Sequence, residues 1–302
     1  MLKLEVMIKF MRQIILLFLG IFVLSSTKLI SQPQTDVFLF SIHQEDGNFS
    51  FKKLARVTNR EGYDNQPYFT ADGKALRFAS IREGGKSDIY RYDIETGETV
   101  NVTNTPNTSE YSPIPIPESR YFSVVMVEED DKTQKLWKFP VEGGEGERIL
   151  DKVEPVGYYT WFKENTLAMF ILGDVFTLQV VNIEDEGNPK TIAENIGRSI
   201  HTIPGTEQVS FVIKESDKKW NINRWNPDNG EIAPIAQTLE GIEDYCWHPQ
   251  GFLLMGKDGE LFMHAPEENT EWESLGNLEI GNFYRLSVSP DGKYLAVVMM
   301  RE

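Results

Sequence analysis

Side chains suited to metal binding or acid–base catalysis are few in this 302-residue sequence. It contains four histidines without metal-ligand spacing, and no Gly-x-Ser-x-Gly nucleophile elbow. The single cysteine, Cys246, excludes an intramolecular disulfide and a cysteine-based zinc site, and we expect it to be a buried, inert thiol. Four side chains remain as possible metal ligands: His201, Glu243, Asp244 and His248. We therefore predict no catalytic residue, no metal site and no cofactor.

Tyrosine, arginine and carboxylate side chains form a second set, of a kind that recognition surfaces favour. They stand seven or eight residues before a series of regularly spaced turns. If those turns belong to a repeat, the shared register places the side chains at one end of the structure. The sequence thus predicts a ligand-binding rim made of Tyr111, Tyr158, Arg198, Glu243, Asp244, Tyr284 and Arg285. The alternative, that they are ordinary strand-entry residues, stays open.

The turns indicate a repeat of a little over 40 residues. Alignment on the turn residue gives six anchors: Gly73, Ser119, Asn165, Thr206, Gly251 and Gly292. Their spacings are 46, 46, 41, 45 and 41 residues, and a four-stranded propeller blade takes about 40–50 residues. Asp72-Gly73 and Asp291-Gly292 are typical hairpin turns, because Gly accepts positive φ and Asp bonds its own backbone. Phe69, Trp161 and Trp247 all lie four positions before an anchor, where an aromatic ring suits packing between adjacent blades.

Six anchors predict six blades. The last anchor leaves room for only two strands, whereas two unassigned strands, at residues 37–42 and 51–58, precede the first anchor. Together these four strands make one blade. The sequence therefore predicts an all-β fold, a six-bladed β-propeller whose ring is closed by N-terminal outer strands plus C-terminal inner strands. Such closure hides sheet edges that would otherwise invite aggregation.

One repeat also resembles a known family. Residues 65–104 contain Pro67-x-Phe69-Thr70-x-Asp72-Gly73-Lys74 and later Asp88-Ile89-Tyr90, and residues 286–298 match the first half of this pattern. The pattern is similar to that of TolB-like, WD-like repeat propellers of bacteria. TolB itself carries an N-terminal α/β domain before its propeller. In this sequence only a few residues separate the first predicted strand from an N-terminal hydrophobic run at residues 14–24. We therefore expect a propeller of this kind without the additional N-terminal domain.

The N-terminal residues indicate the cellular compartment, and the net charge restricts the possible partners. Residues 14–24 form an uncharged run preceded by Lys3, Lys9 and Arg12, which is typical of a secretory signal and too short for a membrane-spanning helix. We predict a signal peptide at residues 1–31, a single propeller domain at residues 32–302 and no membrane span after cleavage. The uncleaved anchor is the alternative. The net charge is −16, which disfavours nucleic acid as a partner.

We therefore expect a periplasmic or secreted bacterial propeller, monomeric and non-enzymatic, that binds a protein, peptide or cell-envelope glycan at one mouth of its channel. The alternative is a propeller hydrolase or lyase, similar to lactonases or pectin-fragment lyases, acting in the channel. Fold alone cannot separate the two, because propellers host both kinds of function.

Overall fold

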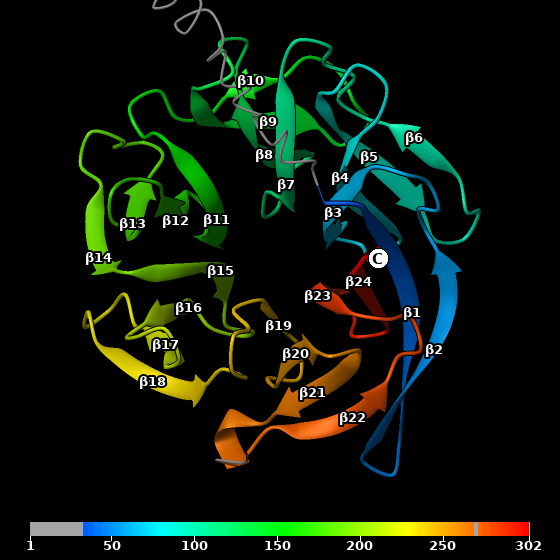
Figure 1. Ribbon diagram of the computed structural model, residues 1–302. Coiled ribbons are helices and arrows are strands. Elements are labelled where there is room, and N and C mark those ends of the chain that lie inside the picture. Colours follow the sequence, from blue (N-terminus) through cyan, green and yellow to red (C-terminus); the bar gives the residue numbers. More distant parts are fainter. Residues whose placement is uncertain (1–32, 269–270, 302) are drawn as a thin grey trace, which may run out of the picture. The chain divides into compact units, whose positions relative to one another are not determined.

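The computed structural model describes residues 33–268 and 271–301, and these residues form a ring of six four-stranded antiparallel sheets (Figure 1). The predicted signal peptide at residues 1–31 lies outside the described residues. Within the described part of the chain, no helix is long and apolar enough to cross a membrane. The all-β, six-bladed propeller predicted from the repeat is confirmed.

Each sheet contributes one strand to each of four concentric positions. The innermost strands are β3 (Tyr63–Phe69), β7 (Ser109–Pro115), β11 (Val156–Lys163), β15 (Ile196–Thr202), β19 (Tyr245–Trp247) and β23 (Phe283–Val288). The second strands are β4 (Ala75–Ile81), β8 (Tyr121–Val127), β12 (Thr166–Ile171), β16 (Val209–Lys214), β20 (Leu253–Lys257) and β24 (Tyr294–Met300).

The outer half of each sheet is less buried than the inner half. The third strands are β5 (Ser87–Asp93), β9 (Gln134–Pro140), β13 (Thr177–Asn182), β17 (Trp220–Trp225), β21 (Glu260–His264) and β1 (Thr35–Glu45). The outermost strands are β6 (Thr99–Asn101), β10 (Glu147–Arg148), β14 (Lys190–Glu194), β18 (Ile232–Gln237), β22 (Glu273–Asn277) and β2 (Asn48–Arg56). One 3₁₀ turn, η1 (Pro266–Glu268), precedes β22. We number the blades 1 to 6 from the β3–β6 sheet onward.

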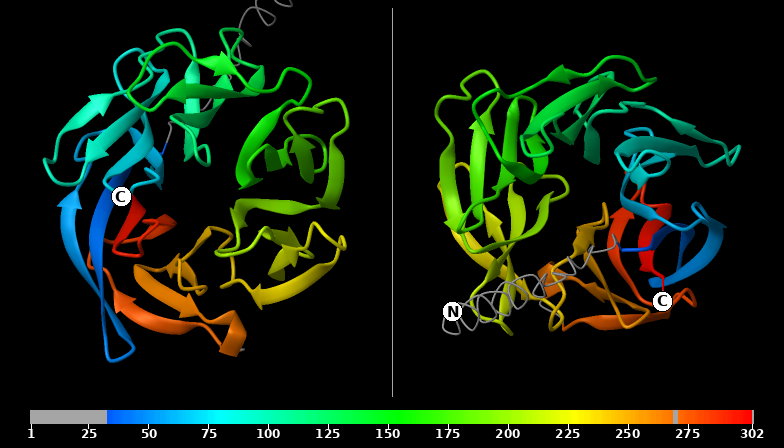
Figure 2. Two further views of the ribbon diagram at one scale, coloured as in Figure 1. Left: turned by 180° about the vertical axis from the view of Figure 1, so that it is seen from behind. Right: turned by 45° about the horizontal axis from the view of Figure 1, so that its top comes forward.

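The closing blade joins the two ends of the chain, as the strand arithmetic predicted. Its strand order is β2-β1-β24-β23, and β1 pairs with β24 from Thr35 opposite Met300 to Ser41 opposite Tyr294. In Figures 1 and 2 the blue N-terminal strands and the red C-terminal strands lie side by side in this sheet. Ring closure therefore depends on strand pairing between segments more than 250 residues apart, since residue 35 meets residue 300.

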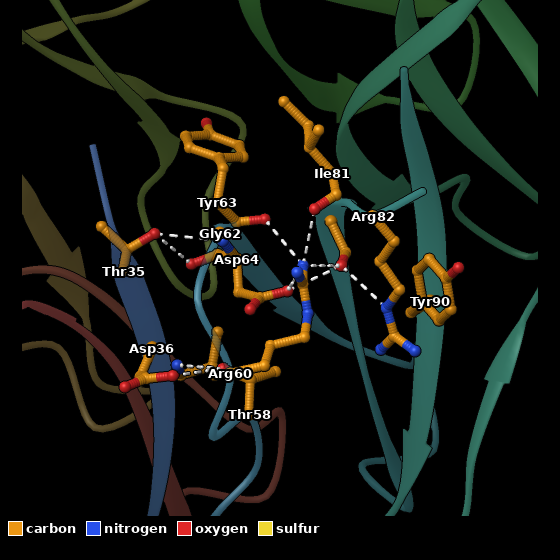
Figure 3. Close-up of polar contacts among 12 residues, drawn as sticks. Thr35, Asp36, Thr58, Arg60, Gly62, Tyr63, Asp64, Ile81, Arg82 and Tyr90 are labelled. Carbon is orange, nitrogen blue, oxygen red and sulfur yellow. Dashed lines mark hydrogen bonds and ion pairs between the residues drawn. The ribbon is translucent and has the colours of Figure 1, made fainter. Parts of the chain in front are cut away.

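Polar contacts tie the closing blade to blade 1 (Figure 3). The Thr35 hydroxyl donates to the Asp64 carbonyl at 2.9 Å and accepts from the Asp64 N–H at 3.0 Å. The buried Asp64 carboxylate accepts from Arg60 at 2.9 Å and from the Ser80 hydroxyl at 2.6 Å. A similar contact recurs at the next interface, where the Ser87 hydroxyl donates to the Glu110 carbonyl at 2.9 Å. These contacts supply partners to polar groups that close packing of the blades removes from water.

The hydrophobic core lies between neighbouring sheets. The described residues contain six buried apolar clusters, one at each interface between adjacent blades. Inner strands are covered on both faces, which explains continuous apolar runs such as residues 295–298 of β24. The packing role predicted for aromatic residues before the anchors is seen at Phe69, Trp161 and Trp247, all of which belong to or pack against these clusters.

Two of these aromatic positions share a polar clamp. Trp161 Nε1 and the Tyr159 hydroxyl of blade 3 both lie 2.9 Å from the Ser123 hydroxyl of blade 2. Two blades further on, Tyr245 and Trp247 converge in the same way on Ser210, at 2.9 and 2.8 Å. Phe69 of blade 1 has no N–H that needs an acceptor. At its interface the position equivalent to Ser123 and Ser210 is occupied by Ala296. The indole N–H and the serine thus occur together, because a buried donor needs an acceptor.

Candidate functional site

The position seven residues before each anchor lines one small cavity, and all six inner strands contribute to its wall. The six residues are Gln66, Ser112, Tyr158, Ser199, Asp244 and Arg285. Since one residue comes from every blade, the cavity lies in the central channel. Its volume is about 40 Å³, and one water needs roughly 10–15 Å³ by this measure. The channel is therefore narrowed at this level to room for a few waters.

Local irregularities in the inner strands bring these side chains to the wall. Five of the six inner strands change register at or beside this position, β19 being the exception. Gln66 and Ser112 take up the extra residue with a φ of 54° each. Such bulges re-aim a side chain and are common beside functional sites. A polar residue with positive φ is uncommon, so both positions store some backbone strain at the cavity.

Arg198 is held by two carboxylates of the next blade. Its guanidinium makes two hydrogen bonds to Asp244, the Nε contact to Oδ1 measuring 3.0 Å. Glu243 Oε1 lies 3.3 Å from Arg198 Nη1, and Glu243 Oε2 accepts from the Arg198 backbone N–H at 3.1 Å. Gly197 permits this approach, because a Cβ there would lie 2.7 Å from Glu243 Oε2. Lys214 completes the group with Nζ 2.9 Å from Glu243.

Arg285 spans the channel. It belongs to blade 6 and donates from Nη2 to the hydroxyl of Tyr158 on blade 3, the opposite blade, at 2.8 Å. The guanidinium carbon lies 5.1 Å from the centre of the Tyr158 ring, and Nε lies 3.6 Å from Asp244 Oδ1. Burial alone would lower the pKa of Arg285, but Tyr158 and Asp244 raise it above its ordinary value. The bridge is thus a charged one, and it crosses the channel at this level.

Three of the predicted residues lie outside the cavity wall. Tyr111 packs against Tyr63, with ring centres 6.4 Å apart, and joins the apolar clusters on both sides of blade 2. Tyr284 accepts a hydrogen bond from Asn65 of blade 1. Glu243 supports Arg198 from behind without lining the cavity. The structure therefore brings together four of the seven predicted site residues on one wall, namely Tyr158, Arg198, Asp244 and Arg285.

The four candidate metal ligands do not converge. Glu243 and Asp244 face arginine and lysine side chains, as above. His248 is stacked on Phe252 at a ring separation of 4.3 Å and lies against Phe49 of the closing blade. Among the described residues, no group of three His, Cys, Asp or Glu side chains is arranged to hold a metal ion.

His201 does reach the cavity. Its ring packs edge-on against Tyr245 at 4.8 Å, and burial lowers its pKa to about 4. The ring is therefore neutral near pH 7. Cys246 is buried, and burial raises the pKa of its thiol, which agrees with the prediction of an inert group.

Several residues that line the cavity are not among those predicted from side-chain type. Gln66, Ser112 and Ser199 hold the same register as Tyr158 and Arg285, and that register alone would have found them. Tyr68, whose pKa burial raises to about 12, also lines the cavity. It stands five residues before its anchor, outside the two positions that the sequence singled out.

Comparison with known proteins places the fold. No protein-family model and no curated protein matches the chain. A solved structure of a TolB candidate from Agrobacterium tumefaciens superimposes with a TM-score of 0.69 and 17% identity, over 90% of this chain and 100% of that one. A chain of a nidogen–laminin complex gives 0.62 and 10%, over 84% and 97%. Oligogalacturonate lyase from Vibrio parahaemolyticus gives 0.59 and 15%, over 88% and 87%.

At these identities the likeness shows a shared fold and no more. The predicted resemblance to TolB-like propellers is confirmed at that level. The neighbours include a chain of a nidogen–laminin complex and a lyase by name, so the shared fold does not separate the two functional readings of the sequence.

Proposed function

We propose that this chain is an exported, non-enzymatic recognition propeller that binds a partner of the cell envelope at the channel mouth formed by the strand entries. The observation that carries the proposal is the convergence of one register position from all six blades on a single polar cavity. Arginine and tyrosine are the side chains that most often anchor binding interfaces. Here Arg198 is held in place by Asp244 and Glu243, and Tyr158 by Arg285, which lowers the entropic cost of binding.

The mouth also carries exposed apolar side chains, which favours a protein or peptide over the cell-envelope glycan. Val175 and Phe176 are each 45% exposed in the loop between β12 and β13. This loop lies at the entry end of β11, because Ile171 of β12 pairs with Val156. Apolar surface beside a charged, aromatic rim is typical of protein contact surfaces.

A capture experiment tests this function. The exported chain is immobilised and exposed to an envelope extract of the source cells, and each component retained is then titrated against purified variants. We expect Arg198→Ala and Tyr158→Ala each to weaken binding by about 1–3 kcal/mol, or about 5- to 150-fold in Kd. Arg120→Ala, an exposed arginine in the hairpin at the opposite end of the inner strands, is the matched control.

Binding unaffected by both rim changes, with an unchanged circular dichroism spectrum, would refute the rim as the site. The enzyme alternative makes a different prediction. Turnover of a lactone or uronide substrate that is lost on replacing His201 would instead place catalysis in the channel.

Export and oligomeric state complete the proposal. N-terminal sequencing of the protein from the extracytoplasmic fraction should give a chain beginning near Gln32, and light scattering should give the mass of a monomer. Recovery of intact residues 1–31 in the membrane fraction would contradict the cleaved signal.

A further inference from the structure

Three polar atoms at the channel cavity are buried without a hydrogen-bond partner. They are the Ser112 hydroxyl, His201 Nε2 and Arg285 Nε. All three residues line the same cavity, and Ser112 is only 2% exposed. A buried polar atom left unpaired costs about 1–3 kcal/mol, so a native structure retains such a cluster for a reason.

The three atoms come from alternate blades. Ser112 belongs to blade 2, His201 to blade 4 and Arg285 to blade 6, so they approach the channel axis from three directions. A serine hydroxyl and an arginine Nε can each donate a hydrogen bond, and neutral imidazole donates from Nε2 in one tautomer. In that tautomer the cavity offers a three-sided set of donors.

Charge selects an anion for these donors. Two arginines, Arg198 and Arg285, and one carboxylate, Asp244, line the cavity, which leaves an excess of one positive charge. Asp244 is already bonded twice by Arg198 and lies 3.6 Å from Arg285 Nε, so it has little capacity to hold a cation. A local excess of positive charge is notable in a chain whose net charge is −16.

Size selects the form of the anion. A volume of about 40 Å³ corresponds to roughly three waters, which matches the three heavy atoms of a carboxylate and is too small for a sugar ring. The Arg285–Tyr158 bridge crosses the channel at the level of this cavity. A peptide can present a carboxylate on a narrow stem, and the exposed Val175 and Phe176 stand at the same end of the sheets.

We propose that the channel cavity is a subsite for one carboxylate group of a bound peptide, held by the Ser112 hydroxyl, His201 Nε2 and Arg285. The assignment rests on the proposed recognition function and specifies the chemistry of the partner. The arginine supplies a charge-assisted hydrogen bond, and the two neutral donors fix the orientation of the carboxylate. The group enters from the strand-entry mouth past Arg198, which is one-third exposed.

Small carboxylates test the subsite directly. N-acetylglycine is titrated into the protein while the ¹⁵N spectrum of its histidines is recorded, with N-acetylglycinamide as the uncharged control. We expect saturable binding of the acid, a shift of the His201 Nε2 resonance and no such response to the amide.

Two variants remove one donor each with little effect on the fold. Ser112→Gly deletes the hydroxyl at a residue whose φ of 54° suits glycine, and His201→Phe keeps the ring beside Tyr245 while removing the nitrogen. We expect each to weaken N-acetylglycine binding about tenfold, as for one hydrogen bond to a charged group. Glu118→Gly, at an exposed residue with a φ of 52°, controls for the glycine itself and should bind as the wild type does.

The outcomes separate this inference from the proposed function. Envelope capture that depends on Arg198 and Tyr158, together with no response to N-acetylglycine, would overturn the carboxylate subsite and leave the recognition function standing. Loss of both would overturn both. Binding of galacturonate in preference to N-acetylglycine would overturn the peptide assignment and favour a uronic acid.

Discussion

The clamp between blades 2 and 3 allows a quantitative test of how the ring is held together. Ser123 is fully buried, and its hydroxyl receives the Trp161 indole N–H at 2.9 Å and donates to the Ile114 carbonyl at 3.1 Å. In Ser123→Ala the indole N–H loses this acceptor. The Tyr159 hydroxyl keeps an alternative acceptor, the Ser112 carbonyl, at 2.9 Å. One buried donor is therefore left unpaired, at a cost of about 1–3 kcal/mol.

The assay is a double-mutant cycle in chemical denaturation. Ser123→Ala should lower the free energy of unfolding by about 2 kcal/mol, or the melting temperature by roughly 4–8 °C for a domain of this size. Trp161→Phe removes the N–H itself, so adding Ser123→Ala to it should cost much less than in the wild type. The blade 6–blade 1 interface already combines Phe69 with Ala296. We expect a coupling energy of about 1–2 kcal/mol.

Additive effects in this cycle would refute the clamp. If the two single losses simply sum, then the serine contributes through packing and the hydrogen bond does not explain why Trp and Ser occur together. Unequal denaturant m-values among the variants would invalidate the comparison, so these are measured alongside.

Two further predictions concern a buried acid and the ring closure. Burial raises the pKa of Glu110 to about 7. Between about pH 4.5 and 7 the folded protein therefore keeps a proton on this carboxyl group that the unfolded chain releases. Glu110 should thus lower the free energy of unfolding by about 3 kcal/mol as the pH rises through this range. The wild type minus Glu110→Gln difference in unfolding free energy should show this fall, and a difference independent of pH would contradict it. A chain truncated after Leu295 loses most of β24, which pairs with both β1 and β23. We expect this truncation to cause aggregation or a large fall in melting temperature. A truncated protein that stays monomeric with an unchanged melting temperature would contradict the closure model.

The architecture could be predicted because its signals are local and repeated. Turns such as Asp72-Gly73 and Asp291-Gly292 are built by neighbouring residues: Asp72 accepts from the Lys74 N–H at 3.1 Å, and Gly73 and Gly292 have φ of 69° and 72°. Degenerate turns could then be found by spacing alone. The closing blade followed from counting strands, because an unpaired edge is unfavourable at either end of the chain.

For the candidate site, the repeat predicts which sequence positions lie at the channel, but it does not predict the contacts that their side chains make. The local sequence does not predict the contact of Arg285 with Tyr158 across the channel, because that contact depends on the diameter of the closed ring. Likewise His201 and His248 stand in similar contexts beside inner strands. His248 packs against Phe49 of β2, a strand from the other end of the chain. His201 instead lines the cavity. The aromatic ring of Tyr111 makes it a candidate from sequence, but the bulge in β7 turns the neighbouring Ser112 to the wall.

The central claim is that recognition takes place at the strand-entry mouth of the channel, and site-specific photocrosslinking tests it most directly. A benzoylphenylalanine replaces Phe176, an exposed aromatic residue at the mouth, and, in a separate variant, Arg120 at the opposite end, and the cells are irradiated intact. The account predicts a discrete crosslinked product at position 176, suppressed when Tyr158→Ala is added, and none at position 120. Crosslinks of equal yield at both positions, or at position 120 alone, would contradict it.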